Sequence, residues 1–219
     1  QGNWTDLIVE GSLDADGSSD TITFTSNQVT PAAGDWGKIL FQQGSTGLLN
    51  SCEISYGGYS SSVANIFVDN CTTTISDCTI INSATYGTWY ELSGAVGPVE
   101  IIGNTYEDNA SGAVGLGLTH HAGNISTSFN TSTGNGSTNG IYVKGTSDGL
   151  SNGTIGGDST WTGQSDFPFL FDFNYSLDIE AGATLTIAPD SVLKFWDSSL
   201  DIYGGLIADA DEDERIYFT

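Results

Sequence analysis

Apolar and polar residues alternate in many short segments of this chain, and no stretch keeps the 3.6-residue spacing of an amphipathic helix. Segments such as 7–13, 185–187 and 216–218 place aliphatic or aromatic side chains at every second position. Because successive side chains of a β-strand point to opposite faces, this alternation predicts strands with one face inside and the other in solvent. The pattern therefore indicates an all-β chain built from short strands.

Similar residues also recur at a fixed spacing of 26 residues through the middle of the chain. Four series keep this spacing: Leu49, Ile75, Ile101 and Thr127; Cys52, Cys78, Asn104 and Asn130; Ile54, Ile80, Tyr106 and Ser132; and Leu40, Ile66, Leu92 and Leu118. A constant period is expected when each unit is one turn of a coil and equivalent residues stack at the strand spacing of about 4.8 Å. We predict a parallel β-helix of about eight or nine rungs, with roughly 26 residues per rung in the middle and the first two series as stacked ladders in its core.

The two ends of the chain share a longer motif. Residues 7–25 align with residues 200–219, with Leu7 on Leu200 and Gly11 on Gly204. We therefore expect residues 1–219 to form a single β-helix domain in which 7–25 and 200–219 are equivalent rungs. Neither end shows a capping segment, so both terminal rungs are predicted to be uncapped, and either flanking repeats or head-to-tail copies in an open filament would cover them.

Three segments carry a family resemblance: LDIEAGATLTIAPDSVLKF at 177–195, LDIYGGLIADA at 200–210, and GDWGKILFQQGSTGLLNSCEISYGG at 34–58. They resemble rungs of the right-handed parallel β-helix repeat family of the pectate-lyase-like superfold, which occurs in secreted and surface proteins. The resemblance covers nearly the whole chain and implies a right-handed, single-stranded coil. It does not imply one activity, because the superfold hosts lyases, hydrolases, epimerases, adhesins and scaffolds.

Candidate catalytic groups are few. A lyase of this superfold would need basic residues to abstract a proton and to hold an acidic sugar, but the chain has only Lys38, Lys144, Lys194 and Arg215, without a cluster. Enzymes that resemble polygalacturonases carry adjacent aspartates and an Arg-x-Lys element, which the sequence lacks. We predict a structural, non-catalytic solenoid, with a carbohydrate-active enzyme or sugar-binding module as the alternative.

Two groups of ring-bearing residues remain open to interpretation. His120 and His121 are adjacent in a strand, so one is expected near the core and the other in solvent. Aromatic residues occupy every second position from 167 to 175, which predicts one face of a strand. That face is either a stacking platform for carbohydrate or an aromatic ladder inside the coil.

Charge is the most extreme compositional feature. The chain has 27 acidic and 4 basic residues and a formal net charge of −23, which excludes nucleic acid and anionic lipid as partners. Two acidic turns offer carboxylates at alternating positions that could converge on Ca²⁺, as in a calcium-dependent adhesin repeat, or could be plain solvated turns. The residues are Asp14, Asp16 and Asp20 in the first turn, and Asp209, Asp211 and Asp213 in the second.

Eight Asn-x-Ser/Thr sequences indicate an extracellular or cell-surface glycoprotein, although solenoid turns also favour these residue types. They begin at Asn3, Asn70, Asn109, Asn124, Asn130, Asn135, Asn152 and Asn174. Of the three cysteines, Cys52 and Cys78 are expected to stack as thiols or a disulfide, and Cys71 has no evident partner. No segment approaches the about 20 apolar residues of a membrane span, which predicts no membrane insertion. The chain begins at Gln1 without an initiator Met or signal peptide, as expected of a processed product or an excised segment.

Overall fold

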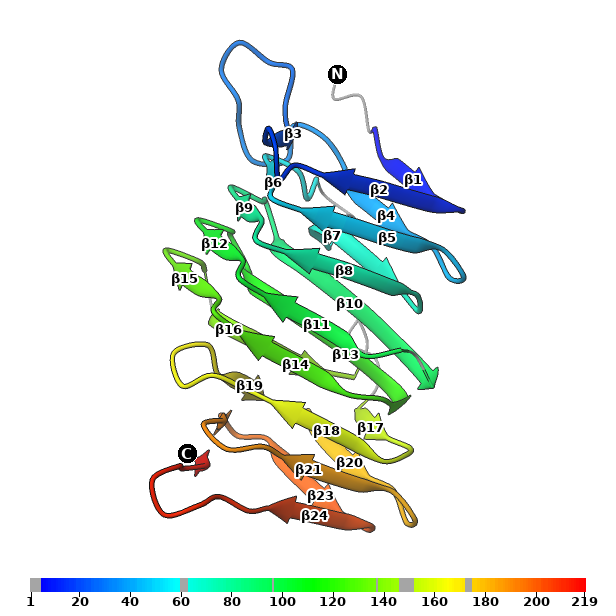
Figure 1. Cartoon of the computed structure of the whole chain (residues 1–219), viewed down its shortest axis with the longest axis vertical. Helices are drawn as coiled ribbons and strands as arrows, with labels where there is room; N and C mark the ends of the chain where they lie inside the picture. The colour runs from blue at the N-terminus through cyan, green and yellow to red at the C-terminus, as the bar shows by residue number, and fades with distance from the viewer. Residues whose placement is uncertain (1–4, 60–62, 96, 137, 146–151, 172–174) are drawn as a thin grey trace.

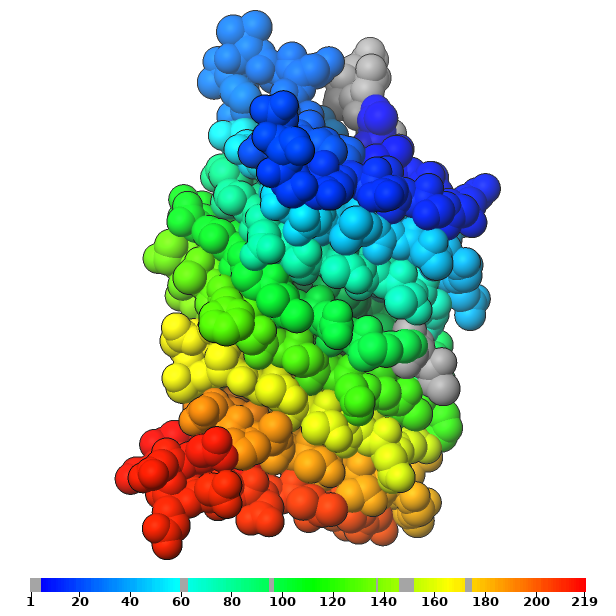
Figure 2. All heavy atoms as spheres, viewed as in Figure 1, coloured from blue at the N-terminus to red at the C-terminus, as the bar shows by residue number. Residues whose placement is uncertain are grey.

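The computed structural model describes residues 5–59, 63–95, 97–136, 138–145, 152–171 and 175–219. In these ranges the chain forms strands that wind into a coil of three parallel sheets, with the N-terminal end at one pole and the C-terminal end at the other (Figure 1). Figure 2 shows the chain colours in successive bands along the long axis, as expected when each turn stacks on the preceding one. The predicted all-β parallel β-helix is confirmed.

The strands belong to three sheets, named A, B and C here. Sheet A contains β1 (Leu7–Val9), β4 (Ile39–Phe41), β7 (Ala64–Asp69), β10 (Tyr86–Ala95), β13 (Gly112–Ala122), β16 (Thr138–Lys144), β17 (Gly153–Ile155), β19 (Phe169–Phe171), β20 (Ser176–Ile179), β22 (Val192–Phe195), β23 (Ser199–Ile202) and β25 (Tyr217–Phe218). Sheet B contains β2 (Ser12–Asp16), β5 (Thr46–Asn50), β8 (Thr72–Ser76), β11 (Val99–Ile102), β14 (Ile125–Ser128), β18 (Ser159–Thr162), β21 (Thr184–Ile187) and β24 (Gly205–Ala208). Sheet C contains β3 (Ile22–Phe24), β6 (Cys52–Ser55), β9 (Thr79–Ile81), β12 (Thr105–Glu107) and β15 (Thr131–Thr133).

Sheet B shows the period most directly. Its register pairs Leu49 with Ile75, Ile75 with Ile101, and Ile101 with Thr127, each 26 residues apart. All four side chains are buried. Successive side chains of a strand point to opposite faces, and these four point into the coil. From the first to the last of the eight sheet-B strands in the described residues, the coil makes about seven turns.

Sheet A does not keep the 26-residue spacing throughout. Leu40 pairs with Phe67 and Ile66 with Thr88, so the predicted column of Leu40, Ile66 and Leu92 is wrong, although Leu92 does pair with Leu118. Two changes in length account for this. The partners Leu40 and Phe67 are separated by the segment that joins β6 to β7, which is longer than the segment that joins β9 to β10. β7 then has 6 residues whereas β10 and β13 have 10 and 11, so the chain leaves sheet A sooner in the β7 rung.

The cross-section of the coil therefore changes along its axis. β13 pairs with both β16 and β17, after which sheet A continues as two columns of strands. In the described residues, sheet C ends at β15. The motifs at the two ends of the chain therefore match in only two of their three strands. The first strands, β1 and β23, both lie in sheet A, and the second strands, β2 and β24, both lie in sheet B. The third strands differ, because β3 lies in sheet C and β25 in sheet A.

A hydrogen-bonded ladder runs along the corner between sheets B and C. The Asn104 side chain accepts from the Cys78 backbone N–H (3.0 Å) and donates to the Ile75 carbonyl (2.9 Å). Asn130 repeats this one rung later, accepting from the Asn104 N–H (3.0 Å) and donating to the Ile101 carbonyl (2.6 Å). Each amide thus satisfies buried backbone groups that the bend of the chain leaves without a sheet partner.

Two cysteines occupy the same ladder one and two rungs earlier. The Cys78 thiol lies 3.4 Å from the Leu49 carbonyl and the Cys52 thiol 3.3 Å from the Ala15 carbonyl, so both donate toward the preceding rung as the asparagines do. Burial raises the pKa of the Cys78 thiol to about 12, which keeps its proton in place. All three cysteines are free thiols.

We predict that Asn104→Ala lowers the free energy of unfolding by about 3 kcal/mol, because it leaves the Cys78 N–H and the Ile75 carbonyl buried without a partner. Asn124→Ala is the matched control, since that exposed side chain accepts a single hydrogen bond, from Thr160 N–H, and should cost less than about 1 kcal/mol. Urea denaturation measures both. Equal costs would show that the ladder contributes nothing beyond an ordinary surface contact.

Candidate functional site

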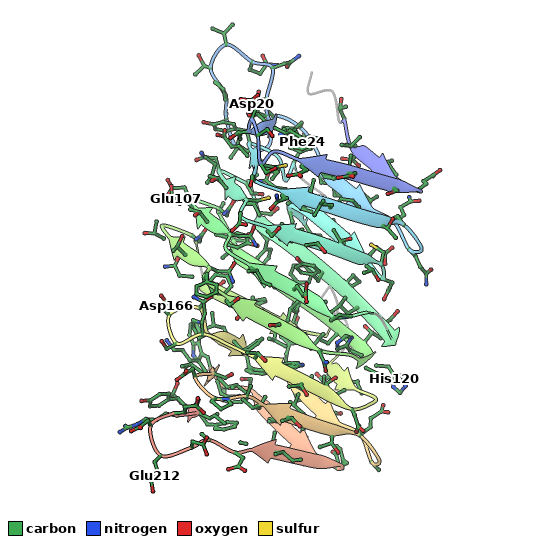
Figure 3. All side chains as sticks on the ribbon, in the orientation of Figure 1. Asp20, Phe24, Glu107, His120, Asp166 and Glu212 are labelled. Atoms are coloured by element: carbon green, nitrogen blue, oxygen red, sulfur yellow. The ribbon has the colours of Figure 1, made fainter. Side chains whose placement is uncertain are left out.

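The two acidic turns lie at opposite ends of the coil, where Figure 3 labels Asp20 near the N-terminal end and Glu212 near the C-terminal end. Asp14, Asp16, Asp20, Asp209, Asp211 and Asp213 are all exposed. The Asp16 carboxylate is used locally, because it accepts from the Asn50 amide (2.9 Å) and the Ser18 N–H (3.0 Å). No three His, Cys, Asp or Glu side chains in the described residues are placed to hold a metal ion, and calcium binding by these two turns stays a prediction.

The predicted glycosylation sites fall into three groups. Asn109, Asn130 and Asn135 are buried and their amides donate to backbone carbonyls of the preceding rung. Burial leaves no room for a glycan at these three residues. Asn130 belongs to the ladder described above, and Asn109 and Asn135 form a second one, in which the Asn135 side chain accepts from the Asn109 N–H at 3.0 Å. Three others are accessible and stay predictions: Asn124 and Asn152 are exposed and Asn70 is partly exposed, whereas Asn3 and Asn174 lie outside the described residues.

His120 is the extra residue of a bulge in β13, because Ser93 pairs with Thr119 and Gly94 with His121. His120 has a left-handed backbone (φ 55°), and its exposed ring pairs with Glu180 at 3.2 Å. His121 is fully buried between Gly94 and Ile155 of the neighbouring rungs, and neither ring nitrogen has a hydrogen-bond partner in the described residues. The expectation of one exposed and one core histidine is thus met. Burial lowers the pKa of His121 to about 4, so the ring is neutral at pH 7.

The aromatic run near residue 170 faces the interior. Phe167, Phe169 and Phe171 are buried, and Phe169 lies 4.9 Å from the Trp161 ring. Phe171 stacks on Phe195 at 4.5 Å. These rings form an aromatic ladder in the core rather than a platform for ligands, which settles that alternative for residues 167–171.

An apolar column lies instead on the outer side of sheet A. Each member pairs with the next one along the coil, and in its own strand it lies between two buried residues. The members are Leu40, Phe67, Trp89, Gly115, Tyr142 and Leu170. We call this set the outer apolar column. Lys194 is the next register partner after Leu170, and the ammonium groups of Lys38 and Lys144 lie 5.6 Å and 5.1 Å from the Phe67 and Trp89 ring centres. Three of the four basic residues therefore lie on this one face.

Trp89 is the centre of this face, although it is fully buried. Its indole N–H donates to the Glu91 carboxylate at 3.0 Å, and its ring occupies the space above Gly115, where a Cβ atom would lie 2.1 Å from the ring. Lys144 covers the same ring with a cation–π contact. The sequence shows no cluster of basic residues, and only the register shows that Lys38 and Lys194 share a face with Lys144 and Trp89.

A cavity of about 800 Å³ opens at the N-terminal end of the coil. It lies between the start of β1, the end of β3 and the segment that leads from β3 to β4, which rises above the first rung in Figure 1. Hydroxyl, amide and carboxylate side chains line it, together with the rings of Phe24 and Trp36. Sequence reasoning missed this cavity because its walls come from segments that the 26-residue repeat does not include.

Apolar side chains are also exposed at both ends of the coil. The first rung exposes Leu7 and Ile8, and the last rungs expose a larger set: Trp196, Ile202, Tyr203, Ile207, Tyr217 and Phe218. Interior residues of the terminal rungs, such as Leu13 and Leu206, are only partly covered, although they pack against the core. The two end faces are thus the least covered apolar surfaces of the described chain.

Comparison with known families agrees with this architecture. The pattern of the right handed beta helix region matches residues 9–132, which is more than half of the chain, so the chain belongs to this family. No curated protein and no solved structure matches the sequence of this chain. Within the described residues, no helix has the length and hydrophobicity needed to cross a membrane.

We predict that His121 makes the fold less stable in mild acid. The unfolded ring takes up a proton near its ordinary pKa of about 6.5, but the buried ring does so only near 4. The free energy of unfolding should therefore fall as the pH drops from about 6.5 to 4, by about 3 kcal/mol from this residue, and its contribution should be complete below pH 4.

Denaturation of His121→Leu across pH 4–7 tests this, because the variant should lose most of that slope. Hydrogen bonds also lower the pKa of Asp16 and of Asp35 below the ordinary carboxyl value of 3.8. Their effect on the free energy of unfolding therefore falls below about pH 4, outside the range of this experiment. An unchanged slope would contradict the assignment to His121.

Proposed function

We propose that this chain is a structural, non-catalytic β-solenoid of an extracellular surface protein. The observation that carries the proposal is the stacking of buried side chains from rung to rung in sheet B, which makes a long scaffold. Asp20 and Glu212 lie at opposite ends of the coil, and His120 and Asp166 lie on opposite sides (Figure 3). The His120 ring does pair with Glu180, but both side chains are exposed on the surface. The accessible asparagines and the acidic surface support the extracellular location.

The end faces support a finer proposal, in which copies of the chain stack head to tail. β24 at one end and β2 at the other are both edge strands of sheet B, and the shared motif aligns Leu206 with Leu13. Stacking would pair the exposed strand edges and cover Ile202, Tyr217 and Phe218. Such a contact joins two different surfaces, so it leads to open filaments. Both ends are acidic, and association should therefore need salt that screens their repulsion.

Leu206→Asp is predicted to abolish filaments seen by electron microscopy for the wild-type chain at high salt, because it places a charge in the covered face. Leu13→Asp should do the same from the other end. A mixture of the two variants should form dimers and nothing larger, since it retains one intact junction. Sedimentation velocity measures the species.

Phe129→Asp is the control, because this exposed side chain lies between β14 and β15, away from both end faces, and its substitution should leave assembly intact. Circular dichroism must show the same fold for all three variants. A wild-type chain that stays monomeric at every salt and protein concentration contradicts head-to-tail assembly.

The outer apolar column supports a second candidate function, carbohydrate binding on sheet A. Phe67, Tyr142 and Leu170 are partly exposed, and sugars stack on aromatic and aliphatic surfaces of this kind. Two of the lysines on this face are held by cation–π contacts. The fold alone is compatible with scaffold or carbohydrate-related roles, and this column is the feature that favours the second.

We predict that Phe67→Ala weakens binding of a neutral glucan hexasaccharide at least about fivefold, since a stacking surface worth about 1 kcal/mol is removed. Phe129→Ala is the control, because that ring is 84% exposed and lies outside the outer apolar column. Isothermal titration calorimetry provides the measurement. Equal affinities for both variants, or no binding by the wild-type chain, would exclude the column as a sugar site.

A further inference from the structure

Hydrogen bonds within the protein hold the walls of the N-terminal cavity in place. The Asp35 carboxylate accepts hydrogen bonds from the Ser26 hydroxyl (2.6 Å) and the Ala32 N–H (2.8 Å), and these bonds fix the segment that rises above the first rung. The Trp36 indole donates to the Ser55 carbonyl at 2.8 Å, which fixes its ring in the wall. A largely preformed cavity of a few hundred cubic ångströms is typical of small-molecule sites.

The cavity offers many polar groups and two aromatic rings. Thr5, Thr23, Asn27, Gln28, Asp6 and Asp35 contribute hydroxyl, amide and carboxylate groups to its lining. One oxygen of Asp6 accepts from the Lys38 N–H (3.1 Å) and one of Asp35 accepts the two bonds described above. The second oxygen of each carboxylate makes no hydrogen bond with the described residues, so both can serve a ligand.

The charged side chains among the described residues of the lining, Asp6 and Asp35, are both negative. Among the described residues that line the cavity there is no Lys, Arg or His. Lys38 is near in sequence, but its ammonium group lies 5.6 Å from the Phe67 ring on the outer side of sheet A. Two carboxylates without a basic neighbour repel anions and attract cations. They are too few for a metal cluster, since no group of three metal-binding side chains occurs in the described residues.

We propose that this cavity binds a sugar unit that carries a protonated amino group. Hydroxyl and amide side chains match the hydroxyl groups of the sugar, and the Phe24 and Trp36 rings offer surfaces for its apolar face. Asp6 and Asp35 recognise the ammonium group through charge-assisted hydrogen bonds. Hydrogen bonds from Ser26 and Ala32 lower the pKa of Asp35, which keeps its carboxylate charged at neutral pH. The same charges exclude uronic acids and sulfated sugars.

Calorimetric titration with a glucosamine hexamer, in dilute low-salt solution where end-to-end contacts are absent, tests the proposal independently of assembly. The hexamer should bind, the N-acetylated hexamer should bind about tenfold more weakly because it lacks the positive charge, and a galacturonate hexamer should not bind. Equal binding of the charged and acetylated hexamers would overturn the role of the amine. Binding of the galacturonate hexamer alone would overturn the site.

Two variants locate the binding site. Asp6→Asn and Asp35→Asn keep an oxygen that can accept the existing hydrogen bonds but remove the charge, so each should weaken glucosamine-hexamer binding about tenfold. Asp20→Asn is the matched control, because it is an exposed carboxylate of the same rung that does not line the cavity. Unchanged thermal unfolding confirms that the variants fold. Equal weakening by all three variants would show non-specific attraction to the acidic surface and would overturn the proposal.

Discussion

The structure depends on hydrogen bonds that each rung can complete only with the next. Where the chain bends between sheets B and C, backbone groups such as the Cys78 N–H and the Ile75 carbonyl turn inward, and the Asn104 amide from the following rung satisfies both. An amide that missed its neighbours by one residue would leave several buried groups unpaired, at a cost of about 1–3 kcal/mol each. This requirement explains why the spacing stays at 26 residues wherever the ladder runs, and why length changes occur elsewhere in the coil.

One of those length changes gives the chain a distinctive surface. Ser12 pairs with Thr46, 34 residues later, because the segment after β3 is longer than in other rungs, and this added segment forms one wall of the N-terminal cavity. Trp89 and the space above Gly115 lie instead in the parts of β10 and β13 that pair with β7 and β16, on the outer face of sheet A. The added segment therefore provides the N-terminal cavity, whereas the regular strands provide the outer apolar column.

Much of the fold could be predicted from the sequence, because a stacked coil turns spatial contact into a constant spacing. The series from Leu49 to Thr127 needed only that spacing. The Leu40 series failed because changes in the length of a strand, or of the segment that joins two strands, shift the register without changing the residue types on either side. Asn109, Asn130 and Asn135 resembled glycosylation sites because a ladder amide followed by a small polar turn has the same local sequence, and only burial distinguishes the two. The N-terminal cavity could not be predicted, since it combines residues from segments outside the repeat. The outer apolar column could not be predicted because it depends on the sheet-A register, which departs from the 26-residue spacing.

The way the ladder ends also determines how two copies could meet. Sheet C stops at β15 in the described residues, and there Gln164 closes the ladder: its side chain accepts from the Asn130 N–H (2.8 Å) and donates to the Asn130 carbonyl (2.8 Å). The rungs beyond this point consist of sheets A and B alone, whereas the first rung also contains β3 of sheet C. The two ends are therefore different surfaces, and a contact between them can continue only sheets A and B. The side of the first rung that bears β3 would face no strand of the neighbouring copy, whereas the cavity also borders β1, the strand that a head-to-tail contact would continue. Stacking on the first rung would therefore meet the edge of the cavity.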